Sequence, residues 1–306
     1  MTFISENIKK IKPSPTMAIT AKARELKLRG ENVISLSSGE PDFDTPEHIK
    51  DAAIKAINQG YTKYTNVEGI PELKESIVRK FKNDNFIDYE ADEVIVGVGG
   101  KQILFNALFA TLNPNDEVII PTPYWVSYPD MTLLAGGIPK FLNCRIENDF
   151  KINADDLDKT ISKNTKWLIL NSPSNPSGSC YTHTELENIA NIIRQFDNVN
   201  VITDDIYEYL VYDKFNFTTL AQVAPDLKDR ILTVNGVSKS YCMTGWRIGY
   251  AAGREDLIRA MIKIQGQSTS NPSSVSQYAA LAGLKGDREF LIPCLKAFDE
   301  RRKLVV

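Results

Sequence analysis

The chain has 306 residues, of which 42% are hydrophobic and 25% are charged, and its formal net charge is −3. This composition is typical of a globular protein with one large domain, or with a large domain and a small one. The lack of a basic stripe argues against nucleic acid as a partner, and no apolar run approaches the roughly 18 residues of a membrane span. Four cysteines lie far apart without a Cys-x-x-Cys motif, which is typical of a reduced, cytoplasmic protein. His48 and His183 are the two histidines, and their spacing predicts neither a metal site nor a Ser-His-Asp triad.

The first part of the chain is predicted to be irregular, with one helix. Thr16 can cap a helix over 17–29, which ends at a glycine. A short strand is predicted over 33–37, and a turn with Gly39 follows it. Gly39 fits either an ordinary turn or a place where a ligand approaches the backbone closely. Further helices are predicted over 46–59 and 70–83, and the loop between them is aromatic and polar.

From about residue 93 the chain alternates between strands and helices. The predicted strands are 94–98, 117–120, 138–142, 167–170, 199–203, 231–234 and 248–252, and the predicted helices among them are 101–112, 184–195 and 256–264. Several strands are unbroken apolar runs, as a sheet that is buried on both faces requires. The alternation predicts one α/β domain with a mostly parallel sheet, whose ligands gather at the carboxyl ends of the strands.

The first predicted strand ends in a glycine-rich turn over 97–102, which opens a helix. Free backbone N–H groups and the positive end of the helix dipole favour an anion there. The turn lacks the longer loop of a P-loop. It is no dinucleotide fingerprint either, because Gln102 stands where the third glycine belongs. The turn therefore fits a phosphate site that is neither a P-loop nor of the Rossmann type.

Other predicted strands end in side chains that could serve the same ligand. These are an indole, an amide, a carboxylate with a phenol, and a lysine with a nearby arginine: Trp125, Asn175, Asp204 with Tyr207, and Lys239 with Arg247. A lysine that is desolvated between buried strands tends to lose its proton and to become a nucleophile towards carbonyls. The set suits a flat, phosphorylated heteroaromatic aldehyde, which is pyridoxal 5′-phosphate.

At this point the sequence resembles a known family, the fold-type I, pyridoxal-phosphate-dependent class I aminotransferases, in their bacterial aspartate/prephenate aminotransferase branch (subfamily Iβ). The motifs that carry the resemblance occur in family order over the whole chain: Gly-Glu-Pro-Asp-Phe (39–43), Tyr-Thr-Asn-Val-Glu-Gly (64–69), Gly-Gly-Lys-Gln (99–102), Pro-Tyr-Trp-Val-Ser-Tyr (123–128), Asn-Ser-Pro-Ser-Asn-Pro-Ser-Gly (171–178), Asp-Asp-Ile-Tyr (204–207) and Ser-Lys-Ser-Tyr-Cys-Met-Thr-Gly-Trp-Arg-Ile-Gly (238–249).

The resemblance implies a role for each matching residue. Lys239 forms a Schiff base with the cofactor and moves a proton on the substrate, and Asp204 keeps the pyridine nitrogen protonated. Tyr207 and Asn175 hydrogen-bond the ring oxygen, and Trp125 stacks on the ring. The implied phosphate ligands are Gly99, Gly100, Lys101, Ser238 and Arg247.

Substrate and partner contacts follow from the resemblance in the same way. Gly39, Trp125 and Asn175 lie at the substrate, and Lys12 matches a position that binds the distal carboxylate in members that act on prephenate. Lys12 fits a solvated terminal lysine equally well. Tyr64 reaches the phosphate of a neighbouring subunit, which implies a homodimer with shared active sites.

The implied fold is a large domain with a mostly parallel mixed sheet flanked by helices, next to a small domain that is incomplete in this sequence. The expected division is 1–45 for the N-terminal arm and part of the small domain, 46–285 for the large cofactor-binding domain, and 286–306 for the start of a long helix. The rest of the small domain, with the arginine that binds the substrate α-carboxylate, is expected to lie outside this sequence.

Two functional hypotheses therefore stay open. The first is transamination of L-aspartate and 2-oxoglutarate to oxaloacetate and L-glutamate, with glutamate and prephenate to arogenate as a further reaction. The second is a truncated remnant that binds the cofactor and dimerises but turns over poorly, because it lacks a bidentate contact to the substrate.

Overall fold

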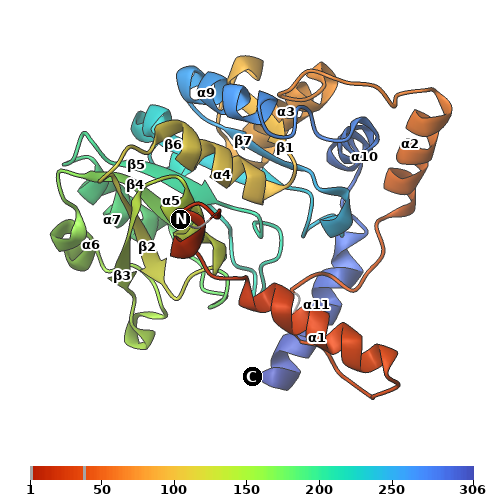
Figure 1. Cartoon of the computed structure of the whole chain (residues 1–306), viewed down its shortest axis with the longest axis horizontal. Coiled ribbons are helices and arrows are strands. Elements are labelled where there is room, and N and C mark those ends of the chain that lie inside the picture. The colour runs from red at the N-terminus through yellow and green to blue at the C-terminus, as the bar shows by residue number, and fades with distance from the viewer. Residues whose placement is uncertain (1–2, 37–38) are drawn as a thin grey trace.

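Residues 3–36 and 39–306 are described by the computed structural model (Figure 1). Within them seven strands form one sheet in the order β1-β7-β6-β5-β4-β2-β3. The strands are β1 (Val94–Gly97), β2 (Glu117–Thr122), β3 (Ile138–Asn143), β4 (Thr165–Asn171), β5 (Asn200–Asp204), β6 (Ile231–Gly236) and β7 (Gly249–Ala252). Strands β3, β2, β4, β5 and β6 run parallel, and β7 is antiparallel to both β6 and β1. The sheet is therefore mixed and mostly parallel, as predicted.

Helices cover both faces of the sheet. The α-helices are α1 (Pro15–Leu28), α2 (Glu47–Asn58), α3 (Pro71–Asn85), α4 (Gly100–Thr111), α5 (Ser127–Leu134), α6 (Ala154–Thr160), α7 (His183–Ile193), α8 (Leu220–Val223), α9 (Glu255–Gly266), α10 (Ser274–Lys285) and α11 (Leu291–Val305). Short 3-10 helices occupy Ile8–Lys10, Ala91–Glu93, Ile146–Asn148, Pro225–Arg230 and Thr244–Trp246. None of the helices in the described ranges is long and apolar enough to cross a membrane.

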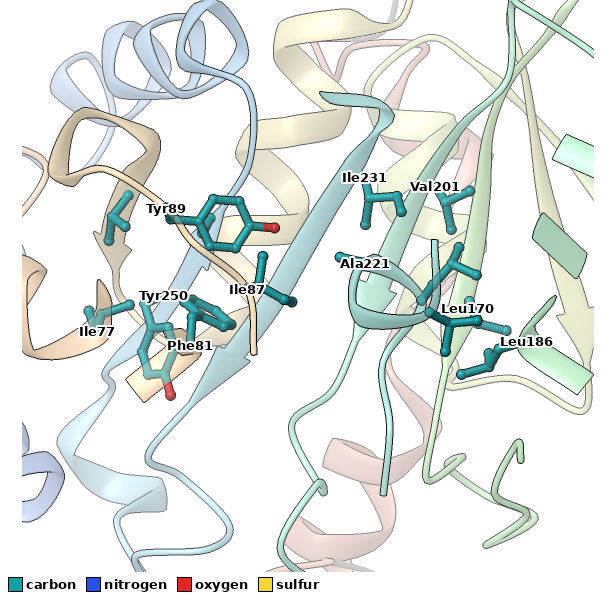
Figure 2. Close-up of a cluster of buried hydrophobic side chains, with 14 of the residues drawn as sticks. Ile77, Phe81, Ile87, Tyr89, Leu170, Leu186, Val201, Ala221, Ile231 and Tyr250 are labelled. Carbon is teal, nitrogen blue, oxygen red and sulfur yellow. The ribbon is translucent and has the colours of Figure 1, made fainter. Parts of the chain in front are cut away.

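Each face of the sheet has its own apolar core. On one face α4, α5 and α9 bury residues such as Leu104 and Met261 against the strands. On the other face lie α3, α7 and α10, and there the ring of Phe81 meets Tyr89 and Tyr250 edge-on (Figure 2). Burial of each large apolar side chain contributes about 1.5–3 kcal/mol. The cores hold the parallel strands in register, so that their carboxyl ends share one edge.

Of the two elements predicted near the N-terminus, the helix is confirmed with a shifted start and the strand is wrong. Helix α1 begins two residues earlier than predicted, since Ser14 rather than Thr16 accepts the capping bond from the Met17 N–H at 3.5 Å, and Pro15 needs no donor in the first turn. The strand predicted over 33–37 is wrong for 33–36, where Ile34 and Leu36 are largely exposed and the backbone joins no ladder. Residue 37 lies outside the described residues.

Helix α11 packs on the segment that follows Gly39. Arg301 makes two bonds to the carboxylate of Asp42, at 2.8 and 3.0 Å. The Phe43 and Phe298 rings meet edge-on, with 5.6 Å between their centroids. Two stretches that are far apart in sequence thus lie together beside the sheet edge that carries the predicted site.

Candidate active site

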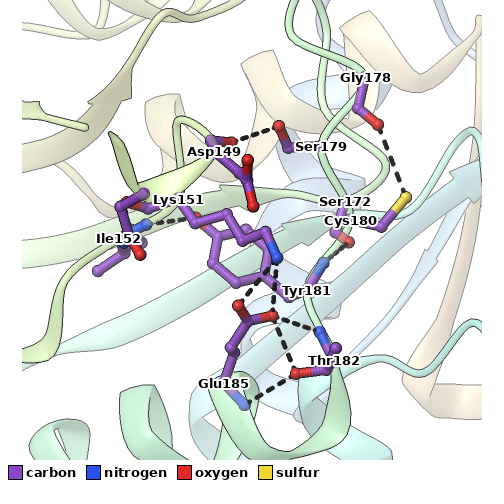
Figure 3. A network of polar contacts seen from close by, with 11 residues as sticks. Asp149, Lys151, Ile152, Ser172, Gly178, Ser179, Cys180, Tyr181, Thr182 and Glu185 are labelled. Carbon is purple, nitrogen blue, oxygen red and sulfur yellow. Dashed lines mark hydrogen bonds and ion pairs between the residues drawn. The ribbon is translucent and has the colours of Figure 1, made fainter. Parts of the chain in front are cut away.

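A cavity of about 800 Å³ opens at the carboxyl ends of the parallel strands. Of the predicted site residues, Gly39, Asn175, Tyr207 and Lys239 line it. Its rim includes Phe298 and Arg302 of α11 and the loops that carry Asp149, Lys151 and Ser179. Figure 3 shows these loops joined, with the Ser179 hydroxyl donating to the Asp149 carbonyl at 2.5 Å and Lys151 donating to Glu185 at 2.8 Å.

Lys239 lies on the turn that follows β6, and its Nζ donates a hydrogen bond to the Gly39 carbonyl. The Nζ atom is 5.9 Å from the centre of the Tyr207 ring. Burial lowers the pKa of Lys239, the Glu40 carboxylate opposes that shift, and the Arg247 guanidinium adds to it. A lowered pKa leaves more of the amine uncharged at a given pH, and the uncharged amine is the form that attacks a carbonyl.

Asp204 ends β5 and is buried beneath the same edge. Burial raises the pKa of this carboxyl, while hydrogen bonds from the Tyr128 hydroxyl and the Ile206 N–H lower it. The Tyr128 hydroxyl donates to Asp204 Oδ2 at 2.7 Å, and the Asn171 amide donates to the Asp204 carbonyl at 2.7 Å. A buried carboxylate is suited to pair with a cationic partner such as a protonated ring nitrogen.

Tyr207 follows Asp204 on a turn, and its hydroxyl is hydrogen-bonded by the side chain of Asn175. Burial, helped by the Asp204 charge and opposed by that hydrogen bond, raises the pKa of Tyr207 to about 12. The phenol therefore keeps its proton at neutral pH and acts as a donor. Asn175 is held by its own N–H, which donates to Asn171 Oδ1 at 2.7 Å. Asn171 thus supports both Asp204 and Asn175.

The N-terminus of α4 forms an anion cradle beside the cavity. Gly99 has φ +79°, and a side chain there would collide with the Arg247 guanidinium. A Cβ on Gly249 would overlap the backbone of Gly99 and Gly100. The Lys101 Nζ lies 4.8 Å from the centre of the Trp125 ring. The Arg247 guanidinium is close enough to Lys101 for its charge to lower the Lys101 pKa. Two cations therefore lie near the N-terminus of α4, an arrangement that suits an anion.

Two sequence-predicted residues lie apart from this constellation. Lys12 is exposed ahead of α1, and Tyr64 is 91% exposed, and neither lines the cavity. Ser238 is buried next to Lys239, and its carbonyl accepts the Met243 N–H at 3.1 Å. The cradle residues, Trp125 and Asp204 are not among the residues that line the cavity. Arg247 and Asp204 lie close enough to Lys239 for their charges to act on its pKa. Trp125 meets the Tyr128 ring edge-on and lies beneath the Lys101 ammonium.

Sequence reasoning missed Tyr128 and Asn171 as supports of the site. Tyr128 belongs to the quoted motif 123–128, but no role was assigned to it. Asp204 itself indicated that such a residue exists, because a carboxylate at the end of a buried strand needs a hydrogen-bond donor close by. The helix that carries Tyr128, α5, was not predicted, so its direction could not be inferred.

Substitution of Tyr128 with phenylalanine removes the donor to Asp204 and keeps the ring. The Tyr128 hydrogen bond lowers the Asp204 pKa, so its loss should let burial raise that pKa further. A hydrogen bond to a charged group contributes about 1.5–3 kcal/mol. We expect the acid limb of the pH–rate profile to move to higher pH by about 1 unit or more. Profiles of kcat against pH for both proteins check this, and superimposable profiles contradict it.

Replacement of Gly249 with alanine should disrupt the cradle. The added methyl group would meet backbone atoms of Gly99 and Gly100, which cannot move away as a flexible side chain can. Overpacking of this kind costs about 1–3 kcal/mol. We expect a lower unfolding midpoint together with weaker retention of phosphate-bearing ligands. Gly245→Ala, where a Cβ meets nothing within 4 Å, is the matched control. Equal midpoints for both variants would contradict the expectation.

A partly buried lysine, a buried carboxylate and a glycine-rich helix N-terminus lie at one edge of a mixed α/β sheet. Residues 31–305 match the model of the family described as aminotransferase class I and II, and the chain belongs to that family. The chain is 57% identical over 306 residues to a probable aspartate/prephenate aminotransferase of Rickettsia felis, covering 100% of this chain and 75% of that protein. It is 58% identical to the aspartate/prephenate aminotransferase of Cereibacter sphaeroides, covering 100% and 76%.

Solved structures agree with this assignment. An aspartate aminotransferase from Rhizobium meliloti superposes with a TM-score of 0.96 at 48% identity, covering 100% of this chain and 76% of that chain. The Thermus thermophilus aspartate aminotransferase with maleate gives 0.96 at 42% identity, covering 99% and 79%. The chain is an aminotransferase by family, and it spans about three quarters of the length of these relatives.

Proposed function

We propose that the protein is a pyridoxal-phosphate-dependent aminotransferase that exchanges the amino group of L-aspartate with 2-oxoglutarate. The observation that carries this proposal is the partly desolvated Lys239 amine, which lies in the cavity within reach of Tyr207 and of the charge of Asp204. The names of the relatives, aspartate and aspartate/prephenate aminotransferase, favour the same substrates.

The residues of this chain fit the cofactor group by group. Lys239 offers an amine to the aldehyde, Asp204 a buried carboxylate to the ring nitrogen, and Tyr207 with Asn175 two donors to the ring oxygen. The cradle at α4 with Arg247 suits the phosphate, and a Cβ at Gly99 would collide with the Arg247 guanidinium there. When bound, the cofactor supplies an electron-poor ring that stabilises negative charge at the substrate Cα.

The chain's own side chains then do the remaining work. The lowered pKa of Lys239 suits an amine that accepts a proton from the substrate Cα and then donates it to another carbon of the bound reactants. Asp204, once paired with a ring N–H, stays ionised, and its charge fixes that proton in place. Tyr207 keeps its proton because burial raises its pKa. The Gly39 carbonyl accepts a hydrogen bond from the Lys239 amine and so holds that amine beside the cavity.

The alternative is that the chain as given binds the cofactor but turns over slowly. Arg302 is the arginine among the described residues that line the cavity. It is already paired with Asp213 at 2.9 Å and with Asp299 at 2.7 Å. A substrate carboxylate would have to compete with both partners. This pairing favours weak substrate binding, unlike a free bidentate guanidinium.

One experiment separates the two readings. The purified protein is loaded with pyridoxal phosphate, its absorbance spectrum is recorded, and oxaloacetate formation from aspartate and 2-oxoglutarate is followed. A cofactor spectrum with rapid turnover supports the aminotransferase, and a spectrum without turnover supports the alternative. Prephenate with glutamate is assayed in parallel, because the Rickettsia felis and Cereibacter sphaeroides relatives are both named aspartate/prephenate aminotransferase. The absence of a cofactor spectrum contradicts both.

We further propose a homodimer in which Tyr64 contacts the partner's cofactor phosphate. The support is the 91% exposure of this tyrosine in the single chain. We also propose that 46–285 forms the cofactor-binding domain, and that 1–45 and 286–306 belong to a smaller unit. The pairing of Arg301 with Asp42 links the latter two. Sedimentation of the loaded protein tests the dimer, since a monomer mass contradicts it.

A further inference from the structure

Tyr207 lies on an irregular turn, and few backbone bonds hold that turn. Within it the Glu208 N–H donates to the Asp205 carbonyl at 3.0 Å, and the Leu210 N–H donates to the Tyr207 carbonyl at 2.8 Å. Ahead of Tyr207 the turn is tied to the sheet, since the Asp205 N–H donates to the Val234 carbonyl of β6 at 2.9 Å and the Ile206 N–H donates to the Asp204 carboxylate. Beyond Tyr207 the turn is anchored by the side chains of Glu208 and Tyr209, which contact α3.

Glu208 points away from the cavity into a buried ionic contact with α3. Its carboxylate pairs with the Lys80 ammonium, and the two side chains are only 2% and 3% exposed. Asn85 completes the contact, since its amide donates to Glu208 Oε2 at 3.1 Å and its carbonyl accepts from Lys80 at 2.7 Å. Lys80 and Asn85 both lie on the last turns of α3.

Tyr209 makes a second contact to the same helix. Its hydroxyl donates to Asp84, and Arg288 holds the Asp84 carboxylate with two bonds at 2.8 and 3.0 Å. The Arg288 guanidinium also lies over the Tyr209 ring, 4.4 Å from its centre. We name the five residues Lys80, Asp84, Asn85, Glu208 and Tyr209 the α3 clamp.

The α3 clamp is better suited to specifying an orientation than to adding stability. A buried ion pair loses solvation that offsets most of its attraction, so an apolar pair of similar size would stabilise the fold as well. An apolar pair, however, lacks the directional hydrogen bonds that fix one orientation of the side chains. Glu208 and Tyr207 are adjacent on a tight turn, so a rotation that released Glu208 from Lys80 would also move Tyr207 away from Asn175 and Lys239.

We infer that Lys80 is a positioning residue that acts through Glu208 to present the Tyr207 hydroxyl to Asn175 and to the cofactor's ring oxygen. The contact with the ring oxygen rests on the proposed function, whereas the contact with Asn175 does not. Lys80 itself touches neither the cavity at Lys239 nor the cradle. Its influence on the reaction is therefore indirect.

The decisive variant removes both buried charges at once, as Lys80→Met with Glu208→Gln. This pair removes one positive and one negative charge, and Asp205, the buried carboxyl that feels both of them, loses an attraction to Lys80 and a repulsion from Glu208 together. The protein should therefore unfold within a few degrees of the unsubstituted chain. Tyr209→Phe is a milder second variant, which removes one hydroxyl of the clamp and keeps the ring. Lys140→Met is the matched control, because Lys140 pairs with Glu117 at 3.0 Å at the far edge of the sheet.

The first measurement needs no cofactor. Tyrosine ring carbons are labelled with 13C, and the Tyr207 signal is assigned by its loss in Tyr207→Phe. In the unsubstituted protein this signal should stay that of the neutral phenol up to about pH 10.5, since the Tyr207 pKa is raised to about 12. In the double variant the phenol should lose the burial that is the largest cause of its raised pKa. It should then ionise near its ordinary value of about 10, although the Asn175 hydrogen bond, which lowers the pKa, is lost as well. Tyr209→Phe should shift the titration in the same direction by less.

The second measurement uses the loaded protein. Loss of the Tyr207 donor should raise the pH of the cofactor's absorbance transition by about 1 unit, since a donor to the ring oxygen favours its anion. A folded double variant with an unchanged Tyr207 signal would overturn the inference, as would an equal shift in Lys140→Met. If the double variant does not fold, an unshifted Tyr207 titration in Tyr209→Phe overturns the inference instead. No cofactor spectrum in the unsubstituted protein would refute only the proposed function.

Discussion

Substitution of Lys239 with alanine will give a folded protein that no longer holds pyridoxal phosphate covalently, and its transamination rate will fall by at least about 10⁴-fold. The amine is both the attachment point and the group that moves the substrate proton, and proton transfer alone contributes about 10²–10⁴-fold. Its contacts are local, to the Gly39 carbonyl and the Tyr207 ring. Stability should therefore change little.

Reduction with borohydride followed by digestion and mass spectrometry checks this result. In the unsubstituted protein the reduced cofactor should be found on the peptide that contains Lys239. Lys151→Ala is the matched control, because Lys151 lines the same cavity but is engaged by Glu185 at 2.8 Å. That variant should retain the link at Lys239. A reducible link on any other lysine in Lys239→Ala would contradict the assignment.

The strand-end residues could be predicted because their positions depend on local patterns. Runs of apolar residues predicted each strand to within a few residues, and parallel strands bring their carboxyl ends to one edge. Asp204 and Lys239 each follow such a run, so their proximity followed from topology. The pairing of β7 against β6 adds Arg247 to that edge from the opposite chain direction.

What could not be predicted depends on contacts between distant parts of the chain. Tyr128 reaches Asp204 across 76 residues, and Asn85 reaches Glu208 across 123. Periodicity within one segment carries no information about such pairs. The strand expected over 33–37 failed for a related reason, since Val33 and Ile34 favour a strand but no strand among the described residues pairs with 33–36.

Substitution of Asp204 with asparagine will separate activity from stability. The amide keeps the shape of the carboxylate and can still accept the Tyr128 bond, but it carries no charge to hold a proton on the ring nitrogen. Loss of a fixed electrostatic partner of this kind typically costs about 10²–10³-fold in kcat. We expect the cofactor to stay bound through Lys239 while turnover falls by that factor.

The unfolding midpoint of the cofactor-free Asp204→Asn protein should stay equal or rise, although its turnover falls. Burial raises the pKa of Asp204 in the folded chain, so the folded state favours the neutral carboxyl. A raised carboxyl pKa contributes stability below the unfolded value of about 4, and that contribution is lost as pH rises through the folded pKa. At neutral pH the buried charge is therefore a cost without cofactor, and asparagine removes it.

Thermal unfolding of the cofactor-free proteins at pH 7 and pH 4 measures this effect. The Asp204→Asn midpoint should equal or exceed that of the unsubstituted chain at pH 7. The difference should shrink at pH 4, where a larger fraction of the native carboxyl is protonated because burial raises its pKa. Once pyridoxal phosphate is added, the unsubstituted protein should gain more, because its carboxylate acquires a cationic partner. A variant that unfolds at lower temperature at pH 7 without cofactor, or that keeps full turnover with it, would show that Asp204 is a structural carboxylate that does not partner the cofactor.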